Sequence, residues 1–229
     1  MFAKFQSAGR RFINPYRLRV LDHPGRVFTF VDPVADQAAI KDIAASRRAA
    51  GGSLVVEIGS GSGGHLIGLA ARELNGSYFG FELRFKRAVR TIEKSTAAGI
   101  DRTYVLNIDG REFSEFFEPA SVDAIYVNFP DPWEKKRQRK HRMLNTQFLD
   151  RAAVCLKPDG FISVKTDHAE YFCEFLPILQ ADRRFEILET TEDLDNSPYF
   201  GGNIATEFEL LFRSQGQAIC YLKARLAAC

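Results

Sequence analysis

Short apolar runs alternate with longer amphipathic segments along most of the chain, and this alternation constrains the fold more than any other feature. The runs SLVVEIG at 53–59 and VDAIYVNF at 122–129 are almost continuously apolar, as expected of strands that are buried on both faces. The segments at 65–76 and 84–99 have the pattern of helices. This alternation predicts an α/β three-layer sandwich, in which helices cover both faces of a mostly parallel sheet.

We expect seven strands in this sheet. They lie at 53–59, 77–83, 103–110, 122–129, 161–167, 184–190 and 206–212. No helix is expected before the last strand, because residues 191–205 are polar turn material. The last strand should therefore be antiparallel and form a hairpin with the sixth, whereas a doubly wound dinucleotide-binding fold would place a helix there.

The length of 229 residues suits one domain of this class. We expect a basic and aromatic N-terminal arm at 1–34, followed by a single domain at 35–229. The four cysteines have no CxxC spacing or histidine partners, so neither a metal site nor a disulfide framework is indicated. The chain lacks a signal-peptide pattern and a membrane-length apolar stretch. These features predict a cytoplasmic protein, monomeric or homodimeric, without a metal or an obligate protein partner.

Positive charge is concentrated in one segment directly after the sequence NFPDPW at 128–133. The net charge is only +2, yet residues 135–142 carry six Lys or Arg and no acid, which leaves the rest of the chain mildly acidic. Such a distribution is typical of proteins that bind a polyanion. We expect phosphate contacts at Lys136, Arg137, Arg139, Lys140 and Arg142. A looser basic cluster lies near the N-terminus at Lys4, Arg10, Arg11, Arg17 and Arg19.

The sequence EIGSGSGG at 57–64 lies at a predicted turn from strand to helix. Glycines there let the backbone pass close to a ligand, and the start of the helix offers free N–H groups. Gly59, Gly61 and Gly64 fit the GxGxxG pattern of NAD-binding proteins. Gly59, Gly61 and Gly63 fit the GxGxG pattern of enzymes that use S-adenosylmethionine. The glycines alone leave both cofactors open.

Three carboxylates favour S-adenosylmethionine. Glu57, Glu82 and Asp109 follow or end the first three predicted strands, whose carboxyl ends should line one crevice. Glu82 suits the ribose of either cofactor. Glu57 would repel a pyrophosphate but attract the amino group and sulfonium of S-adenosylmethionine, and Asp109 suits the adenine amino group. Helix capping or loop polarity is the alternative interpretation of Glu57 and Asp109.

The sequence NFPDPW should lie across the crevice from the glycine loop, at the end of the fourth strand. Because proline restricts the residue before it, we expect Phe129 and Asp131 to be extended, with pre-aimed side chains. A ring held beside a carboxylate suits a flat, hydrogen-bonding substrate such as a nucleobase. The alternative is a rigid turn whose Trp133 packs on the core.

The segment NFPDPWEKKRQRKHRM resembles the motif FPDPW-x-K-x-R of the bacterial tRNA (guanine-N7)-methyltransferases. Similarity extends over roughly residues 50–222, through EIGSGSG, GFELR at 80–84, KTDHAEY at 165–171 and TEFE at 206–209. The resemblance implies a class I enzyme that uses S-adenosylmethionine to methylate N7 of a guanosine in the tRNA variable loop, at position 46. Two positions depart from the family pattern, namely Ser62, where lysine is usual, and Asp159, where glycine is usual.

The resemblance also assigns roles by position. It implies that Asp131 is catalytic and that the cofactor is bound by Glu57, Gly59, Gly61, Gly63, Glu82, Asp109 and Asp131. It implies that the substrate is bound by Lys135, Asp167, Thr206, Glu207, Phe208 and Glu209. Asp167 and Glu209 could instead be strand-end or cross-strand residues.

The chemistry of the implied reaction bears on Asp131. Guanine N7 has an in-plane lone pair and no proton to lose, so the reaction requires positioning and charge complementarity more than a base. We therefore expect Asp131 to orient the guanine or to stabilise the positive charge of the methylated ring. Three alternatives are an exocyclic-amine methyltransferase, an inactive RNA-binding module of the same fold and a dehydrogenase. The first normally has Asn/Asp-Pro-Pro-aromatic at the end of the fourth strand, which this chain lacks.

Overall fold

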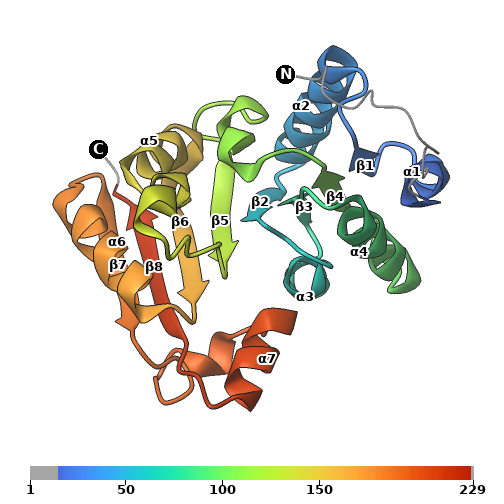
Figure 1. The fold of residues 1–229 in the computed structure, drawn as a ribbon. Coiled ribbons are helices and arrows are strands. Elements are labelled where there is room, and N and C mark those ends of the chain that lie inside the picture. Colours follow the sequence, from blue (N-terminus) through green and yellow to red (C-terminus); the bar gives the residue numbers. More distant parts are fainter. Residues whose placement is uncertain (1–14, 228–229) are drawn as a thin grey trace.

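The computed structural model describes residues 15–227 and contains an eight-stranded sheet in the order β1-β4-β3-β2-β5-β6-β8-β7 (Figure 1). The neighbours from β1 to β6 are parallel, and β8 is antiparallel to both β6 and β7. The strands are β1 (Val27–Phe28), β2 (Ser53–Ile58), β3 (Gly76–Phe81), β4 (Thr103–Leu106), β5 (Val122–Asn128), β6 (Leu156–Thr166), β7 (Phe185–Thr191) and β8 (Cys220–Leu226).

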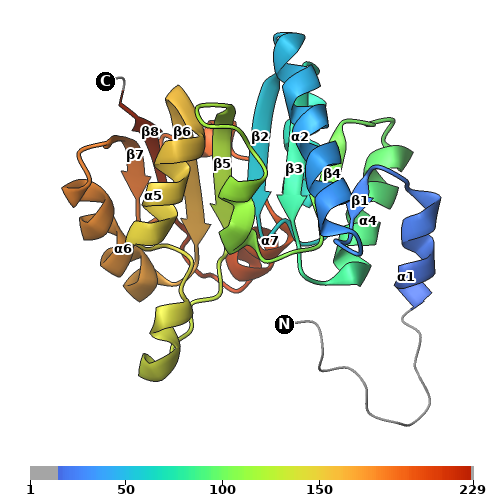
Figure 2. The same ribbon diagram turned by 90° about the horizontal axis from the view of Figure 1, so that it is seen from above.

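Helices cover both faces of this sheet (Figure 2). One layer holds α2 (Pro33–Ala49), α5 (Thr146–Cys155) and α6 (Ala169–Ala181), and the other holds α3 (Gly64–Arg72), α4 (Phe85–Ala97) and α7 (Glu207–Ser214) (Figures 1 and 2). The short helix α1 (Pro15–Arg19) lies beside α4. Four 3-10 turns complete the described elements: η1 (Val20–Asp22), η2 (Gly110–Glu115), η3 (Lys136–His141) and η4 (Phe200–Gly202). The predicted three-layer sandwich with an antiparallel last strand is confirmed.

The prediction of seven strands is wrong in two places. Residues 27–28 form an additional edge strand, β1, which pairs with β4. Residues 206–212, predicted as the last strand, belong mostly to helix α7, and the last strand is β8. The helix begins at a capping box, in which the Thr206 side chain accepts from the Glu209 amide and the Glu209 carboxylate accepts from the Thr206 amide. The predicted hairpin is therefore an antiparallel pair, β7 and β8, connected through a helix.

The predicted N-terminal arm is only partly described. Lys4, Arg10 and Arg11 lie outside the described residues. Arg19 forms an ion pair with Glu93 on α4 at 2.5 Å. Arg26, just before β1, donates hydrogen bonds from Nε to the Thr103 carbonyl at 2.7 Å and from Nη2 to the Ile100 carbonyl at 3.0 Å. These contacts join residues 19–28 to the sheet and to α4, while the domain boundary at residue 34 stays a prediction.

Strand β6 has apolar side chains on one face of the sheet and polar side chains on the other. Ile162 and Val164 point into the main hydrophobic core, where α5 and α6 pack. Side chains alternate along a strand, so Ser163 and Lys165 point to the opposite face, on the side of α3 and α7. In the register of β5 and β6, Ser163 pairs with Tyr126 and Lys165 with Asn128. The second face of β5 and β6 is therefore polar, and it leads to the site described below.

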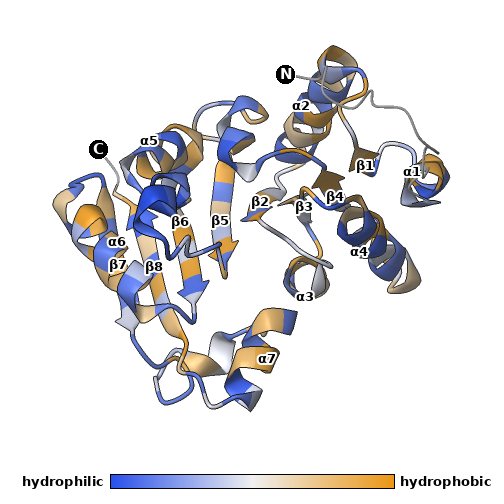
Figure 3. Cartoon of the chain, in the orientation of Figure 1, coloured by the Kyte–Doolittle hydropathy of each residue, from blue (hydrophilic) through white to orange (hydrophobic). Residues whose placement is uncertain are grey.

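None of the helices within residues 15–227 is both long and apolar enough to cross a membrane. Hydrophilic residues make up the whole of η3, between β5 and α5 (Figure 3).

Candidate active site

The glycine loop connects β2 to α3 and needs its glycines for conformation. Gly59, Gly61 and Gly63 have positive φ angles of 74°, 57° and 78°, in the left-handed region that favours glycine. A Cβ atom on Gly63 would also lie 2.3 Å from the Thr91 side chain, so α4 packs closely against the loop. Nothing lies within 4 Å of a Cβ built on Gly59 or Gly61. The backbone at these two positions is therefore open to a ligand.

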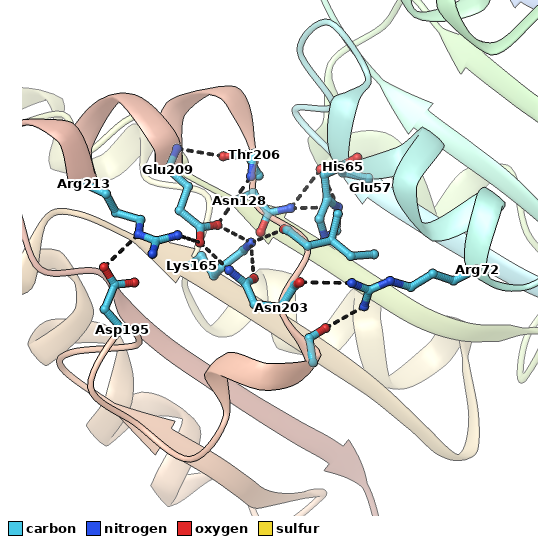
Figure 4. Close-up of polar contacts among 12 residues, drawn as sticks. Glu57, His65, Arg72, Asn128, Lys165, Asp195, Asn203, Thr206, Glu209 and Arg213 are labelled. Atoms are coloured by element: carbon cyan, nitrogen blue, oxygen red, sulfur yellow. Dashed lines mark hydrogen bonds and ion pairs between the residues drawn. The ribbon is translucent and has the colours of Figure 1, made fainter. Parts of the chain in front are cut away.

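Glu57 is buried at the end of β2, with 2% of its surface exposed. Its Oε1 accepts a hydrogen bond from Asn128 Nδ2 at 2.8 Å and lies 3.0 Å from His65 Nδ1 (Figure 4). Its Oε2 is also buried and has no hydrogen-bond partner within residues 15–227. One oxygen is therefore fixed by the protein, and the other is left without a hydrogen-bond donor.

Glu82 and Asp109 follow β3 and β4, as predicted. Glu82 is buried and accepts hydrogen bonds from the Arg84 amide at 2.7 Å and from the Gly61 amide at 3.1 Å. Asp109 caps η2 and accepts from Arg111, through its amide at 3.0 Å and its guanidinium. The hydrogen bonds from Arg111 hold the pKa of the Asp109 carboxyl below its usual value. Glu82 thus stiffens the glycine loop, and Asp109 is paired with Arg111.

The backbone of NFPDPW differs from the prediction at Phe129. The sequence predicts an extended residue there, but Phe129 has a φ of +52°, which is strained for a non-glycine residue before proline. Its amide donates to the Lys165 carbonyl at 2.7 Å, and its ring lies 5.5 Å from that of Phe212 and 6.5 Å from that of Phe208. The tertiary contacts of β6 and α7 therefore hold a conformation that proline geometry alone would disfavour.

The remaining residues predicted near the substrate differ in how firmly they are held. Asp131 and Lys135 are exposed, and Asp167 is half-buried after β6. None of these three side chains makes a hydrogen bond or ion pair with another described residue. Trp133 also has a positive φ, of 44°, and its ring lies 5.6 Å from that of His141, so it contacts the basic segment.

The stretch from Thr206 to Glu209 has two buried and two outward-facing residues. Glu209 is fully buried and accepts from Lys165 Nζ at 2.6 Å (Figure 4). Burial lowers the pKa of Lys165, while the adjacent carboxylate opposes that shift. Glu207 forms a surface ion pair with Lys94 at 2.7 Å, and the Phe208 ring lies 5.5 Å from the Arg87 guanidinium. Glu209 therefore anchors α7, and the other two residues contact α4 above the glycine loop.

His65 lines two cavities. A cavity of about 30 Å³ lies between the glycine loop and the start of α7, and Glu57, Asn128, Phe129 and Phe208 are among its lining residues. That volume suits a small polar group rather than a whole nucleoside. A larger cavity of about 410 Å³ lies against the polar face of β5, β6 and β8, and none of the predicted site residues lines it.

The basic segment has two kinds of residue. Lys136, Arg137 and Lys140 are exposed and make no ion pair with another described residue. Arg139 pairs with Glu170 at 2.6 Å and with Glu174, both on α6. Arg142 is only 5% exposed, and it donates to the Pro132 carbonyl at 2.7 Å and contacts Glu174. A phosphate could reach Arg142 only if these contacts broke, so in this structure it joins NFPDPW to α6.

Sequence reasoning missed Asn128 and His65 as site residues. The Asn-Pro-Pro-aromatic pattern, which Asn128 does not fit, assigns it no role, and no motif includes His65. The available signal was strand alternation, because Asn128 ends β5 in a position that shares a face with Glu57 across the β2–β5 pair. No local pattern would have placed His65 beside them.

Comparisons with known proteins identify the fold and the family of this chain. A family model described as "Putative methyltransferase" matches residues 52–222. An antibiotic-resistance methyltransferase, Kmr, superposes with a TM-score of 0.57 over 84% of this chain and 93% of its own, at 14% identity. TrmN from Thermus thermophilus superposes with a TM-score of 0.54 over 80% of this chain and 48% of its own, at 18% identity. The fold is thus that of a class I methyltransferase.

Closer relatives define the family. The tRNA (guanine-N(7)-)-methyltransferase of Lachnoclostridium phytofermentans is 37% identical over 74% of this chain and 78% of its own. That of Enterococcus faecalis is 35% identical over 76% and 80%. This chain belongs to the tRNA (guanine-N7)-methyltransferase family. It is also 33% identical to a bifunctional glycosyltransferase/methyltransferase of Fusobacterium nucleatum, over 87% of this chain but only 30% of that longer relative.

The residues present fit the methyl donor of this class, S-adenosylmethionine. The buried, unpartnered Oε2 of Glu57 suits a positively charged amino group. The glycine backbone is open to close approach, and Glu82 stands at the adjacent strand end. A dinucleotide pyrophosphate would meet the negative charge of Glu57 at this point, so the site does not suit NAD.

Proposed function

We propose that the protein transfers a methyl group from S-adenosylmethionine to N7 of the variable-loop guanosine at position 46 of tRNA. The observation that carries this proposal is the hydrogen bond from Asn128 to Glu57. It joins the glycine loop at the end of β2 to NFPDPW at the end of β5. A cofactor site and a candidate base-binding segment therefore share one crevice, beside the exposed basic residues of η3.

In this proposal the chain binds and orients, and the cofactor supplies an electrophilic methyl group. Glu57 attracts the amino group of the cofactor, the backbone of the glycine loop lies against it, and Glu82 and Asp109 bind the ribose and the adenine. For Asp109 to do so, its carboxylate must turn from Arg111 or accept a further hydrogen bond. No proton transfer is needed before the methyl group moves, because N7 of guanine carries a free lone pair.

Asp131 is exposed and unpaired within residues 15–227, so its carboxylate is free to face the substrate. We propose that it orients the guanine through the N–H groups of the base or stabilises the charge that forms on the methylated ring. Lys135, Asp167 and the outward-facing Glu207 and Phe208 are proposed to hold the nucleotide. Thr206 and Glu209 act indirectly, because their side chains fix the start of α7.

The tRNA backbone is proposed to lie along η3. Lys136, Arg137 and Lys140 are free to contact phosphates, which position the RNA without reading its sequence. Arg139 could contact a phosphate from its half-buried position, whereas Arg142 holds the segment in place. The proposed substrate places the enzyme in the cytoplasm.

The test is incubation of the purified protein with an unmodified tRNA transcript and radiolabelled S-adenosylmethionine, followed by borohydride and aniline cleavage. Cleavage at guanosine 46 is expected, since N7 methylation makes that nucleotide sensitive. A transcript with adenosine at position 46 is the matched control and should take up no label. Label without aniline-sensitive cleavage would indicate methylation of an exocyclic amine. Binding of the cofactor and tRNA without label would indicate an inactive RNA-binding module.

A further inference from the structure

The amide of Asn128 has a fixed orientation in the buried network at the ends of β2 and β5. Asn128 is 7% exposed, and its Nδ2 lies 2.8 Å from Glu57 Oε1 and 3.2 Å from His65 Nδ1 (Figure 4). An amide nitrogen carries N–H groups and no acceptor, so it can donate to the Glu57 carboxylate. The opposite orientation would place the amide oxygen against a carboxylate oxygen and repel it. The charge of Glu57 therefore selects the orientation seen.

This orientation leaves the other amide oxygen, Oδ1, without a hydrogen-bond partner within residues 15–227, although it is buried. Glu57 Oε2 is buried and unpartnered in the same way. Both residues line the small cavity between the glycine loop and α7. Two buried and unsatisfied acceptors on residues that line one cavity are costly unless a donor satisfies them, and one of the two belongs to a carboxylate.

We propose that Asn128 is a further cofactor-binding residue, whose Oδ1 accepts a hydrogen bond from the amino group of S-adenosylmethionine while Glu57 Oε2 accepts a second. The cavity volume of about 30 Å³ suits an amino group. A protonated amino group has three N–H donors and a positive charge, which match one neutral and one charged acceptor. The inference rests on the proposed function, because it assigns a residue to the cofactor of that reaction.

The Asn128 side chain thus has two tasks, since its nitrogen fixes the Glu57 carboxylate and its oxygen contacts the ligand. His65 is a positioning residue in this arrangement. Its Nδ1 lies 3.2 Å from Asn128 Nδ2 and 3.0 Å from Glu57 Oε1, and its ring packs edge-on against Tyr126, with centroids 4.9 Å apart. The network recognises the amino-acid end of the cofactor and leaves the adenosine end to other residues.

Calorimetry with two ligands tests this assignment. S-adenosylhomocysteine keeps the amino group, whereas 5′-methylthioadenosine has the adenosine and sulfur but no amino acid. Asn128→Ala should weaken S-adenosylhomocysteine binding about tenfold or more, in line with the loss of a charge-assisted hydrogen bond, and leave 5′-methylthioadenosine binding within about twofold. Asn75→Ala is the matched control, because Asn75 is exposed and precedes β3 at the opposite edge of the sheet. It should leave both affinities unchanged.

Glu57→Gln provides a second variant that keeps the size of the side chain, in case Asn128→Ala does not fold. This variant should also bind S-adenosylhomocysteine more weakly, while its affinity for 5′-methylthioadenosine should stay close to that of the wild type. Equal affinity of wild type and Asn128→Ala for S-adenosylhomocysteine would overturn the assignment and leave the proposed function intact. A parallel loss of both ligands would also overturn it, since that result would mean a general distortion of the loop. If the wild-type protein bound neither ligand, the proposed function itself would fail.

Discussion

At the scale of single residues, Asp131 differs from the other carboxylates of the site. Glu57 and Glu82 are buried and hydrogen-bonded, and Asp109 is paired with Arg111. Asp131 is exposed without a partner in the described chain, so its proposed role depends on charge offered to the substrate. We expect Asp131→Asn to lower turnover about 100-fold or more, the size typical for loss of one preorganised electrostatic group. The dissociation constant for tRNA should change by no more than a few fold.

Single-turnover methylation and filter binding measure these two quantities. Asp159→Asn is the matched control, because Asp159 lies near the amino end of β6, opposite the site, and has a positive φ of 64° that asparagine tolerates. A near-normal turnover of Asp131→Asn would disprove the role proposed for its charge.

At the scale of elements, a buried ion pair between Glu209 and Lys165 of β6 holds the helix α7 in place. Glu209 is fully buried against Lys165, so its removal leaves an unpaired charge in the interior. We expect Glu209→Ala to lower the free energy of unfolding by about 3–5 kcal/mol. Glu207 lies two residues earlier in the same helix, and its ion pair with Lys94 is on the surface. Glu207→Ala should therefore change the free energy of unfolding by less than about 1 kcal/mol.

Urea unfolding of both variants measures the difference. A small effect of Glu209→Ala would mean that Lys165 is neutral or is sufficiently stabilised by its hydrogen bonds to Asn203 Oδ1 and the Ile204 carbonyl, and that α7 is held by its ring contacts instead.

At the scale of the whole molecule, exposed Lys and Arg side chains lie both beyond the carboxyl ends of the parallel strands and near their amino ends. Lys136, Arg137 and Lys140 lie beyond the carboxyl end of β5, on the side of the site. Changing all three to alanine should weaken tRNA binding and reduce the slope of log Kd against log salt by about two to three. The slope falls because a complex with fewer phosphate contacts releases fewer counterions when it forms. The thermal midpoint should stay close to wild type, since these side chains make no ion pair in the described chain.

The matched control removes the same charge from the other edge. Lys157, Arg184 and Arg225 lie at the amino end of β6, before β7 and near the end of β8, and all three are about half exposed. Alanine at these positions should leave the salt slope unchanged. Equal slopes for the two triple variants would show that net charge, rather than the position of η3, controls RNA binding.

The sequence determined the layered α/β fold and the place of the site. Near-continuous apolar runs identified β2, β3 and β5 nearly to the residue, because burial on both faces is a local requirement on each of these strands. The edge strand β7, which is part-buried on one face and exposed on the other, was located within one residue by the alternation of its side chains. The carboxylates at the ends of β2 and β3 followed from that, since parallel strands end at one edge. The run of charge after NFPDPW needed no structure to be recognised.

Tertiary structure decided which groups meet and which are free. The sequence TEFELLF is apolar enough for a strand, and its Thr206–Glu209 capping box is a local helix signal that the sequence also contains. The burial of Glu209 against Lys165, 44 residues away, fixes the helix. Arg142 looks like its basic neighbours in sequence and is buried by Glu174 and Pro132. Asn128 meets Glu57 across 71 residues. Such pairings depend on the face, register and depth of both partners, and none of these is a property of either segment alone.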